Sequence, residues 1–268
     1  MANQWFLCGD IHGKPHPIEN FMRRHSEINF DGTDKIILLG DAGFNFYLGD
    51  QRYQSGHADE NFKKKMGKFP FTYYVVRGNH EERPQNMAQN NPDAWEFKFD
   101  AQVNGMIYVE KAFPYIRYFD DTPSIYLIGG YRTLIMGGAY SVDKNYRLAK
   151  GWSWFKDEQL TQEEMSLVNQ LCEITNWTCD LVLTHTCPYC FEPTDLFLSS
   201  IDQNTVDKSM ERFFGNIEFK LQYRGWCWGH FHEYRDYPRV DSHKQLMLSD
   251  DILVELTQFM EEDVPAKL

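Results

Sequence analysis

The sequence predicts an α/β protein in which two mixed β-sheets pack as a sandwich, with helices on the outer faces. In the first half, short apolar runs alternate with amphipathic stretches, which indicates parallel strands joined by helices. From about residue 106 onward the apolar runs follow one another closely, which indicates hairpins. No internal repeat and no Pro/Gly/Ser-rich linker interrupts the chain, so we expect a single domain over residues 1–268.

The first half contains three short apolar runs with the length and composition of buried strands. The predicted strands lie at 4–8, 35–39 and 71–76. Polar stretches with apolar residues at helical spacing follow each run. The predicted helices lie at 17–25, 59–68 and 82–88.

The second half is richer in strands. The predicted strands lie at 106–110, 115–118, 124–128, 133–136, 181–184, 225–228, 245–248 and 253–256. The clearest helix is 162–174, because Thr161 and Glu164 have the spacing of a capping box. Met165, Val168, Leu171 and Cys172 would line its buried face.

Composition narrows the class of protein. A formal charge of −12 disfavours an extended nucleic-acid surface. No stretch approaches the roughly 20 apolar residues of a membrane span, so we expect no membrane partner. The N-terminal residues enter the first strand without a basic region or an apolar leader, so we expect a cytoplasmic location. Six cysteines are too few for a disulfide scaffold in a chain of 268 residues, so we expect reduced thiols.

Potential metal ligands directly follow five of the predicted strands. Four strands end in a glycine and then a ligand, in the blocks Gly9-Asp10-Ile11-His12, Gly40-Asp41, Gly78-Asn79-His80 and Gly229-His230-Phe231-His232. The strand at 181–184 delivers His185 without a glycine. Loops at the carboxyl ends of strands converge in α/β sheets, and glycine allows a sharp turn close to a ligand. We therefore expect these side chains to meet.

The donor types indicate a site for two metal ions. Carboxylates, an amide and imidazoles without a thiolate suit Mn, Fe, Zn or Co better than Ca or a structural zinc. Two such cations about 3.5–4 Å apart can hold a bridging hydroxide that attacks a phosphoryl group in line. Asp41 is the natural bridging carboxylate, because it is the only ligand in its block.

Asn79 and His80 are neighbours in an extended segment, so their side chains point to opposite sides. We expect Asn79 to bind metal through its amide oxygen. His80 is then available as the general acid that protonates the leaving oxygen. Sequence alone leaves three candidates for an acidic partner of His80, namely Asp50, Asp59 and Asp143.

Cationic side chains are expected to complete the phosphate site. Residues 137–147 combine glycines, a hydroxyl, Lys144 and Arg147 in what we interpret as one loop, a composition that often binds anions. An ordinary hairpin with solvated charges is the alternative. Arg77 is a third candidate for substrate binding, and we expect Tyr140 to pack rather than bind. Cys187 and Cys190 have metal-site spacing, but we favour reduced thiols over a structural zinc.

These blocks resemble, in order, those of the calcineurin-like metallophosphoesterases: Asp-x-His, Gly-Asp, Gly-Asn-His-Glu, a lone His and Gly-His-x-His. They extend from residue 9 to residue 232, which is most of the chain. The resemblance implies a two-sheet sandwich with His80 near the scissile bond. It further implies one metal ion held by Asp10, His12, Asp41 and His232, and a second held by Asp41, Asn79, His185 and His230.

One block departs from the Ser/Thr protein phosphatase branch, whose second block runs Gly-Asp-x-x-Asp-Arg-Gly. Here residues 40–46 read Gly-Asp-Ala-Gly-Phe-Asn-Phe, although residues 76–81 look like that branch's third block. We therefore expect a dinuclear hydrolase of the wider superfamily, a phosphomonoesterase acting on a phosphoprotein or a small phosphoester. A phosphodiesterase or nuclease, and a non-catalytic binding module on the same scaffold, are the alternatives.

Overall fold

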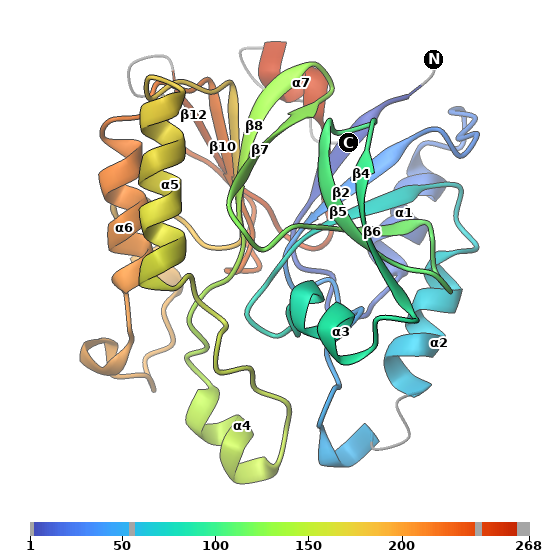
Figure 1. The fold of residues 1–268 in the computed structure, drawn as a ribbon, viewed down its shortest axis with the longest axis horizontal. Helices are drawn as coiled ribbons and strands as arrows, with labels where there is room; N and C mark the ends of the chain where they lie inside the picture. Colours follow the sequence, from blue (N-terminus) through green and yellow to red (C-terminus); the bar gives the residue numbers. More distant parts are fainter. Residues whose placement is uncertain (1–2, 54–56, 239–242, 262–268) are drawn as a thin grey trace.

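The computed structural model describes residues 3–53, 57–238 and 243–261. Within them the chain folds into two mixed β-sheets that pack face to face, with helices on both outer faces (Figure 1). Leu7, Ile37, Leu183 and Cys227 come from strands of both sheets and belong to one buried cluster between them. The predicted fold class is confirmed.

The first sheet has seven strands among the described residues, in the order β13-β1-β2-β3-β6-β5-β4. Their bounds are β1 (Trp5–Cys8), β2 (Lys35–Leu39), β3 (Thr72–Val76), β4 (Trp95–Asp100), β5 (Gly105–Glu110), β6 (Ile116–Phe119) and β13 (Leu253–Glu255). Strands β1, β2, β3 and β6 run parallel, while β13, β5 and β4 are antiparallel to their neighbours. The carboxyl ends of β1, β2 and β3 therefore lie at one edge.

The second sheet has six strands in the described part of the chain, in the order β11-β12-β10-β9-β8-β7. Their bounds are β7 (Ser124–Ile128), β8 (Tyr131–Met136), β9 (Leu181–Thr184), β10 (Gly225–Trp228), β11 (Arg235–Asp236) and β12 (Lys244–Met247). The central strands β8, β9, β10 and β12 run parallel, and the edge strands β7 and β11 are antiparallel.

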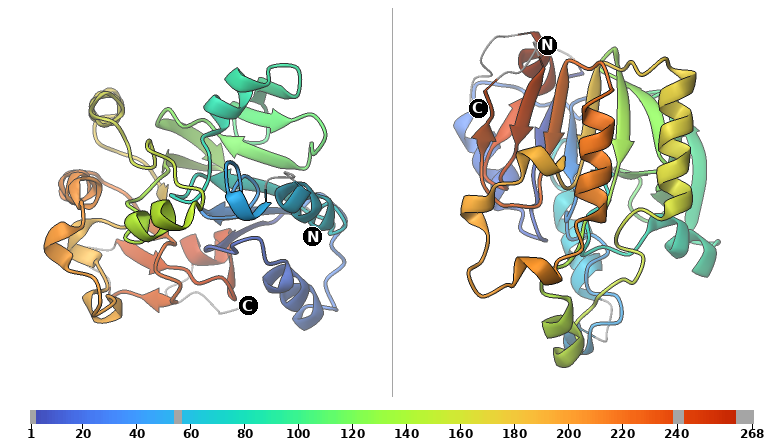
Figure 2. Two further views of the ribbon diagram at one scale, coloured as in Figure 1. Left: turned by 90° about the horizontal axis from the view of Figure 1, so that it is seen from below. Right: turned by 90° about the vertical axis from the view of Figure 1, so that its left-hand side faces the viewer.

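Helices flank the outer faces of the sandwich, and two short helices lie at its opposite ends (Figure 1, Figure 2). The α-helices are α1 (His16–Arg24), α2 (His57–Met66), α3 (Pro84–Asn90), α4 (Lys144–Lys150), α5 (Gln162–Ile174), α6 (Ser209–Glu218) and α7 (Leu256–Glu261). Short 3₁₀ turns occur at η1 (Gln51–Tyr53), η2 (Tyr189–Phe191), η3 (Thr194–Leu196) and η4 (Gln203–Thr205). Helices α1 and α2 pack on the first sheet through a cluster that includes Ile18, Phe62 and Tyr73. Helices α5 and α6 pack on the second sheet through Val168, Phe214 and Trp226.

Most predicted elements are present, with end points shifted by a few residues. All eleven predicted strands form, and helix α5 has the predicted bounds and the predicted capping box at Thr161. Strands β4 and β11 and helices α6 and α7 were not predicted. The expectation of one loop over 137–147 is corrected, because its last four residues begin helix α4. None of the helices in the described ranges has the length and apolarity needed to cross a bilayer.

Candidate metal centre

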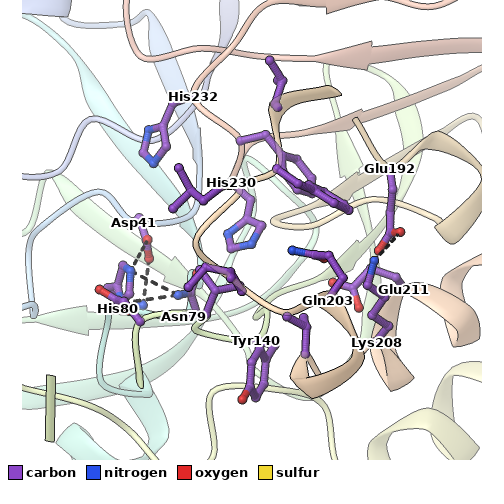
Figure 3. Close-up of a pocket in the computed structure, with 18 residues that line it drawn as sticks. Asp41, Asn79, His80, Tyr140, Glu192, Gln203, Lys208, Glu211, His230 and His232 are labelled. Atoms are coloured by element: carbon purple, nitrogen blue, oxygen red, sulfur yellow. Dashed lines mark hydrogen bonds and ion pairs between the residues drawn. The ribbon is translucent and has the colours of Figure 1, made fainter. Parts of the chain in front are cut away.

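The predicted ligands lie together at the carboxyl ends of five parallel strands. Asp10 follows β1, Asp41 follows β2, and Asn79 follows β3 of the first sheet. His185 follows β9, and the block containing His230 and His232 follows β10 of the second sheet. Figure 3 shows several of these side chains pointing toward one shared space. The site therefore lies where the two sheets meet.

Asp10, His12 and His232 form the first candidate ligand group. The Nε2 atoms of His12 and His232 are 3.4 Å apart, and His12 Nε2 is 3.9 Å from Asp10 Oδ2. His12 and His232 are partly exposed, whereas Asp10 is buried. This group faces the outer side of the site and is accessible from solvent.

Asp10, Asp41 and His185 form the second candidate group, and all three are buried. His185 Nε2 is 3.7 Å from Asp41 Oδ2 and 2.8 Å from Asn79 Oδ1. The rings of His185 and His230 lie with their centroids 5.0 Å apart. Asp10 belongs to both groups, whereas the family resemblance gives the shared position to Asp41.

The second group has the donor chemistry of a cation site. His185 Nδ1 lies 2.7 Å from the carbonyl oxygen of Leu39, which fixes the proton on that nitrogen. The Nε2 atom then carries a lone pair that faces two acceptors, the amide oxygen of Asn79 and the carboxylate of Asp41. Asp10 Oδ2 is also buried without a hydrogen-bond partner. Acceptors that converge without a proton between them fit a metal ion.

Burial keeps the imidazoles of the site neutral, as metal ligands require, but disfavours a second ionised carboxylate beside Asp41. Burial lowers the pKa of His12 to about 4, so the imidazole is neutral at pH 7. Burial likewise lowers the pKa of His185 and, more strongly, that of His230. Burial raises the pKa of Asp10, and the charge of Asp41 raises it further, because two carboxylates share a water-poor space. A cation there would neutralise that charge.

Comparison with known proteins agrees with the geometry. The family model described as Calcineurin-like phosphoesterase matches residues 6–234. The chain belongs to this family. The matched region contains all seven predicted ligands and strands of both sheets, while β11, β12 and β13 follow it.

Solved structures with low sequence identity resemble this calcineurin-like phosphoesterase. The chain is similar to TT1561 of Thermus thermophilus, with a TM-score of 0.53 and 11% identity over 100% of this chain and 99% of that one. It is also similar to a dimetal phosphatase from Danio rerio, with a TM-score of 0.47 and 9% identity over 95% and 93% of the two chains. No curated protein sequence matches the chain. Because its identity is low, the first similarity shows the fold alone.

Three glycines make room for ligands of other blocks. A Cβ atom on Gly40 would lie 2.1 Å from His185 Nδ1, and one on Gly78 would lie 2.0 Å from Asp41 Oδ1. A Cβ atom on Gly229 would lie 2.1 Å from Asp10 Oδ1. Each of these glycines therefore permits a contact between blocks, a requirement that the sequence spacing alone does not show.

A buried hydrogen-bond network orients Asn79, and sequence reasoning missed most of it. Asn79 Nδ2 donates to Ser141 Oγ (2.8 Å), and Ser141 Oγ donates to Glu158 Oε2 (2.5 Å). Trp154 Nε1 also donates to Glu158 Oε2 (2.8 Å). With its NH₂ group held in this way, the amide oxygen of Asn79 faces His185. The only signal in the sequence was the hydroxyl of Ser141 in the segment considered for anion binding.

Glu81, the last residue of the Gly-Asn-His-Glu block, supports the turn after Asp41. Its Oε1 atom accepts from the backbone N–H groups of Gly43 (2.8 Å) and Phe44 (3.3 Å). Burial and the charge of Asp41 raise the pKa of Glu81 to about 8. Sequence analysis gave this residue no role.

His80 lies beside Asp41 and close to the start of helix α4. Its backbone N–H donates to Asp41 Oδ1 (2.9 Å), and its Nε2 atom is 3.9 Å from Asp41 Oδ2 (Figure 3). Burial lowers the pKa of His80, the charges of Asp41 and Asp143 raise it, and that of Arg147 lowers it. Asp143 and His80 line the same cavity.

The other two candidate partners of His80 lie away from its cavity and are paired elsewhere. Asp50 pairs with Arg52 at 2.7 Å, and Asp59 accepts from the backbone N–H of Tyr47 at 3.0 Å. Neither carboxylate lines the cavity that His80 faces. Asp143 is therefore the best placed of the three.

The three predicted substrate-binding cations lie in different surroundings. Arg77 is buried, pairs with Asp121 at 2.7 Å and donates to the carbonyl oxygen of Glu158, away from the cavity. Lys144 lies over the ring of Trp154, 4.1 Å from its centroid.

Arg147 is buried and its Nε donates to Asp143 Oδ2 at 2.8 Å. Its guanidinium lies 5.3 Å from the centroid of Phe46, whose ring is 5.8 Å from that of His80. Of the three cations it is the one linked by contacts to the predicted acid.

Two smaller expectations are settled by the structure. Tyr140 lines the cavity next to His80, so the expectation that it only packs is corrected. The six cysteines all lie in the described ranges and are free thiols; Cys187 is buried and Cys190 exposed. No cysteine belongs to a group of potential metal ligands within the described residues.

Proposed function

We propose that the chain is a metal-dependent phosphomonoesterase. The observation that carries the proposal is that carboxylates, an amide and neutral imidazoles from both sheets surround one point, with His80 beside them and a cavity in front. Membership of the calcineurin-like phosphoesterase family supports the same reaction class.

The ligands divide between two positions. We assign Asp10, His12, Asp41 and His232 to one metal ion, and Asp41, Asn79, His185 and His230 to the other. When bound, a pair of Mn, Fe or Zn ions supplies Lewis acids that neutralise charge on the phosphoryl oxygens and lower the pKa of a water molecule. The chain contributes neutral imidazoles and buried carboxylates in fixed positions.

In the overall reaction, water adds its oxygen to phosphorus, the bond from phosphorus to the ester oxygen breaks, and an alcohol leaves. We assign His80 to donate a proton to that departing oxygen. Burial lowers the pKa of His80 overall, and the carboxylates of Asp41 and Asp143 oppose that shift toward the neutral imidazole. Arg147 does not itself line the cavity, but Asp143, which does, holds it, so Arg147 is our first candidate to contact the phosphoryl group and Lys144 the second.

The cavity favours a small monoester over a nucleic acid. Lys208 is the one lysine or arginine among the described residues that line it, and its Nζ pairs with Glu192 at 2.8 Å. A polyanion would need several unpaired cations along its backbone. The net charge of −12 points in the same direction.

Activity measurements with matched variants test the proposal. The protein reconstituted with Mn²⁺ should hydrolyse p-nitrophenyl phosphate faster than bis(p-nitrophenyl) phosphate. His80→Ala should lower kcat by roughly 10²–10⁴-fold, because a general acid contributes about that factor. His57→Ala, on the exposed start of α2, is the control and should keep full activity.

Metal analysis separates the enzyme from a binding scaffold. The wild-type protein should hold two metal ions per chain after dialysis, and Asp41→Asn should hold fewer. Full activity of both Asp41→Asn and His80→Ala would overturn the proposal. Faster hydrolysis of the diester than of the monoester would show that the protein is a phosphodiesterase rather than a phosphomonoesterase.

A further inference from the structure

The cavity in front of the metal centre extends well beyond the space that a phosphate group needs. It has a volume of about 380 Å³. At one end lie metal-centre residues such as Asn79 and His230, and at the other lie Glu192, Lys208 and Glu211 (Figure 3). A group that leaves phosphorus would enter this space. The cavity therefore has room for the organic part of a substrate.

The wall between the two ends is apolar. It is formed mainly by one irregular segment, residues 191–208, and by the loop after β10. The apolar lining residues of these two segments are Leu196, Phe197, Leu198, Ile201, Val206 and Phe231, and Val142 adds to them from the loop before α4. The rings of Phe197 and Phe231 are inclined by 29°, with centroids 6.5 Å apart. Such a wall binds an alkyl or aromatic body by burying its surface.

The far end of the cavity is polar, and one of its hydrogen-bond acceptors has no donor. Lys208 is occupied by Glu192 and by the ring of Phe197, 4.5 Å from its ammonium group. Glu211 is only 6% exposed, and its Oε1 accepts from Thr186 Oγ1 at 2.9 Å. Its Oε2 atom is buried without a hydrogen-bond partner. A buried acceptor without a donor is costly, so a donor supplied by a ligand would be favoured.

We propose that the cavity is the leaving-group site, and that the substrate is the phosphomonoester of an alcohol with an apolar body and a hydrogen-bond donor at its far end. The inference rests on the proposed function. The apolar body lies along the wall formed by residues 196–206, and the donor binds the carboxylate of Glu211. Anionic leaving groups, such as the sugar phosphates of a nucleotide chain, are disfavoured because the carboxylates outnumber the single lysine.

A series of alkyl phosphates tests the apolar wall. Ethyl, butyl and hexyl phosphate differ little in the acidity of the departing alcohol, so differences in kcat/KM report binding of the chain. Burial of one CH₂ group contributes about 0.8 kcal/mol, roughly fourfold, so the four additional CH₂ groups of hexyl phosphate should raise kcat/KM over that of ethyl phosphate by roughly 200-fold if all are buried. Ile201→Trp, which fills part of the cavity, should reduce this ratio.

A second series tests Glu211. Among ω-aminoalkyl phosphates of about four to eight carbons, at least one should exceed the plain alkyl ester of equal length by about tenfold, because hydrogen bonds to charged groups contribute about 1.5–3 kcal/mol. Glu211→Gln, which keeps the shape but removes the charge, should remove most of this preference. Asp195→Asn is the matched control, since Asp195 lies in the same segment, pairs with Arg235 and does not line the cavity.

The outcomes separate this inference from the proposed function. Hydrolysis of all esters with equal kcat/KM would overturn the leaving-group site and leave the phosphomonoesterase intact. An amino preference that survives in Glu211→Gln would overturn the role of Glu211. Absence of hydrolysis for every ester, p-nitrophenyl phosphate included, would overturn the proposed function and this inference with it.

Discussion

Four of the seven candidate ligands have a backbone conformation that side chains other than glycine rarely adopt. The φ angles are 45° at His12, 43° at Asp41, 71° at His230 and 57° at His232. Each such residue costs roughly 1–3 kcal/mol, so it persists only where the surrounding structure holds it. At the residue scale, then, the chain gives up stability at the positions where side chains must be aimed at one point.

Ser141 should matter for metal affinity although it is not a ligand. Ser141→Ala removes the acceptor that holds the NH₂ group of Asn79 and leaves Glu158 without its hydroxyl donor. Loss of such an outer partner typically lowers metal affinity by about 10–100-fold. Calorimetric titration with Mn²⁺ measures this, and Ser166→Ala, exposed on α5, is the control. Unchanged affinity in Ser141→Ala would contradict the assigned role.

Glu211 should make stability depend on pH. Burial raises its pKa from 4.5 to about 7, so the folded protein holds this proton more tightly than the unfolded chain. A raised carboxyl pKa means that stability falls as pH rises between about 5 and 7. Relative to wild type, Glu211→Gln should therefore gain about 2–3 kcal/mol between pH 5 and pH 8.

Urea unfolding at both pH values, with metal removed, measures this difference. Glu163→Gln on α5, exposed at the surface, provides the comparison. A constant difference between Glu211→Gln and wild type at the two pH values would show that Glu211 does not carry the effect.

At the scale of elements, strand ends and tight turns decide where ligands meet. Gly78→Ala would place a Cβ atom 2.0 Å from Asp41 Oδ1 and 2.3 Å from its backbone nitrogen. Since backbone cannot yield as a side-chain tip does, the turns after β2 and β3 would separate. We expect Gly78→Ala to lose metal binding and activity, measured by metal content and by hydrolysis of p-nitrophenyl phosphate.

The matched control is a glycine inside a helix. Gly215, in α6, would meet only ordinary contacts at 3.7 Å, and alanine is about 0.5–1 kcal/mol better than glycine within a helix. Gly215→Ala should therefore keep its metal and be at least as stable as wild type. Equal metal content in Gly78→Ala and Gly215→Ala would contradict the steric argument.

Elements with a clear hydrophobic period could be predicted, and those without one could not. Helix α5 has a capping box and an apolar face, and its bounds follow from the sequence. Strand β4 has four exposed residues between two buried ends, so no buried run indicates it. Helix α6 contains Gly215, which weakens its helical signal. Helix α4 is short and follows a glycine-containing turn, so the sequence pattern favoured the prediction of a loop there.

At the scale of the molecule, the metal centre joins the two sheets. The meeting of the ligands in space could be predicted, because the carboxyl ends of parallel strands converge. Asp10, Asn79 and His230 each follow such a strand. The cavity could not be predicted, because segment 191–208 has no period and its wall exists only once α6 and the loop after β10 are in place. Partners far apart in sequence, such as Thr186 and Glu211, leave no local signal.

Because ligands come from both sheets, metal binding should stabilise the whole fold. A ligand that binds only the folded state adds about 2.7 kcal/mol at 100 times its Kd, which corresponds to several degrees in Tm for a chain of this size. Without metal, Asp10 is buried and its Oδ2 has no hydrogen-bond partner. Asp10→Asn removes that buried charge while Oδ1 can still accept from the backbone N–H of His230.

We therefore expect Asp10→Asn to have opposite effects on thermal stability in the metal-free and the metal-bound protein. In EDTA the variant should unfold at the same or a higher Tm than wild type, since a neutral amide is less costly than a second carboxylate buried beside Asp41. In Mn²⁺ the wild type should gain several degrees and the variant should gain little. Thermal unfolding followed by circular dichroism measures both, with Asp195→Asn as the surface control. If Mn²⁺ raised the Tm of Asp10→Asn as much as that of wild type, Asp10 would not be a metal ligand. The metal centre would then not link β1 to β10.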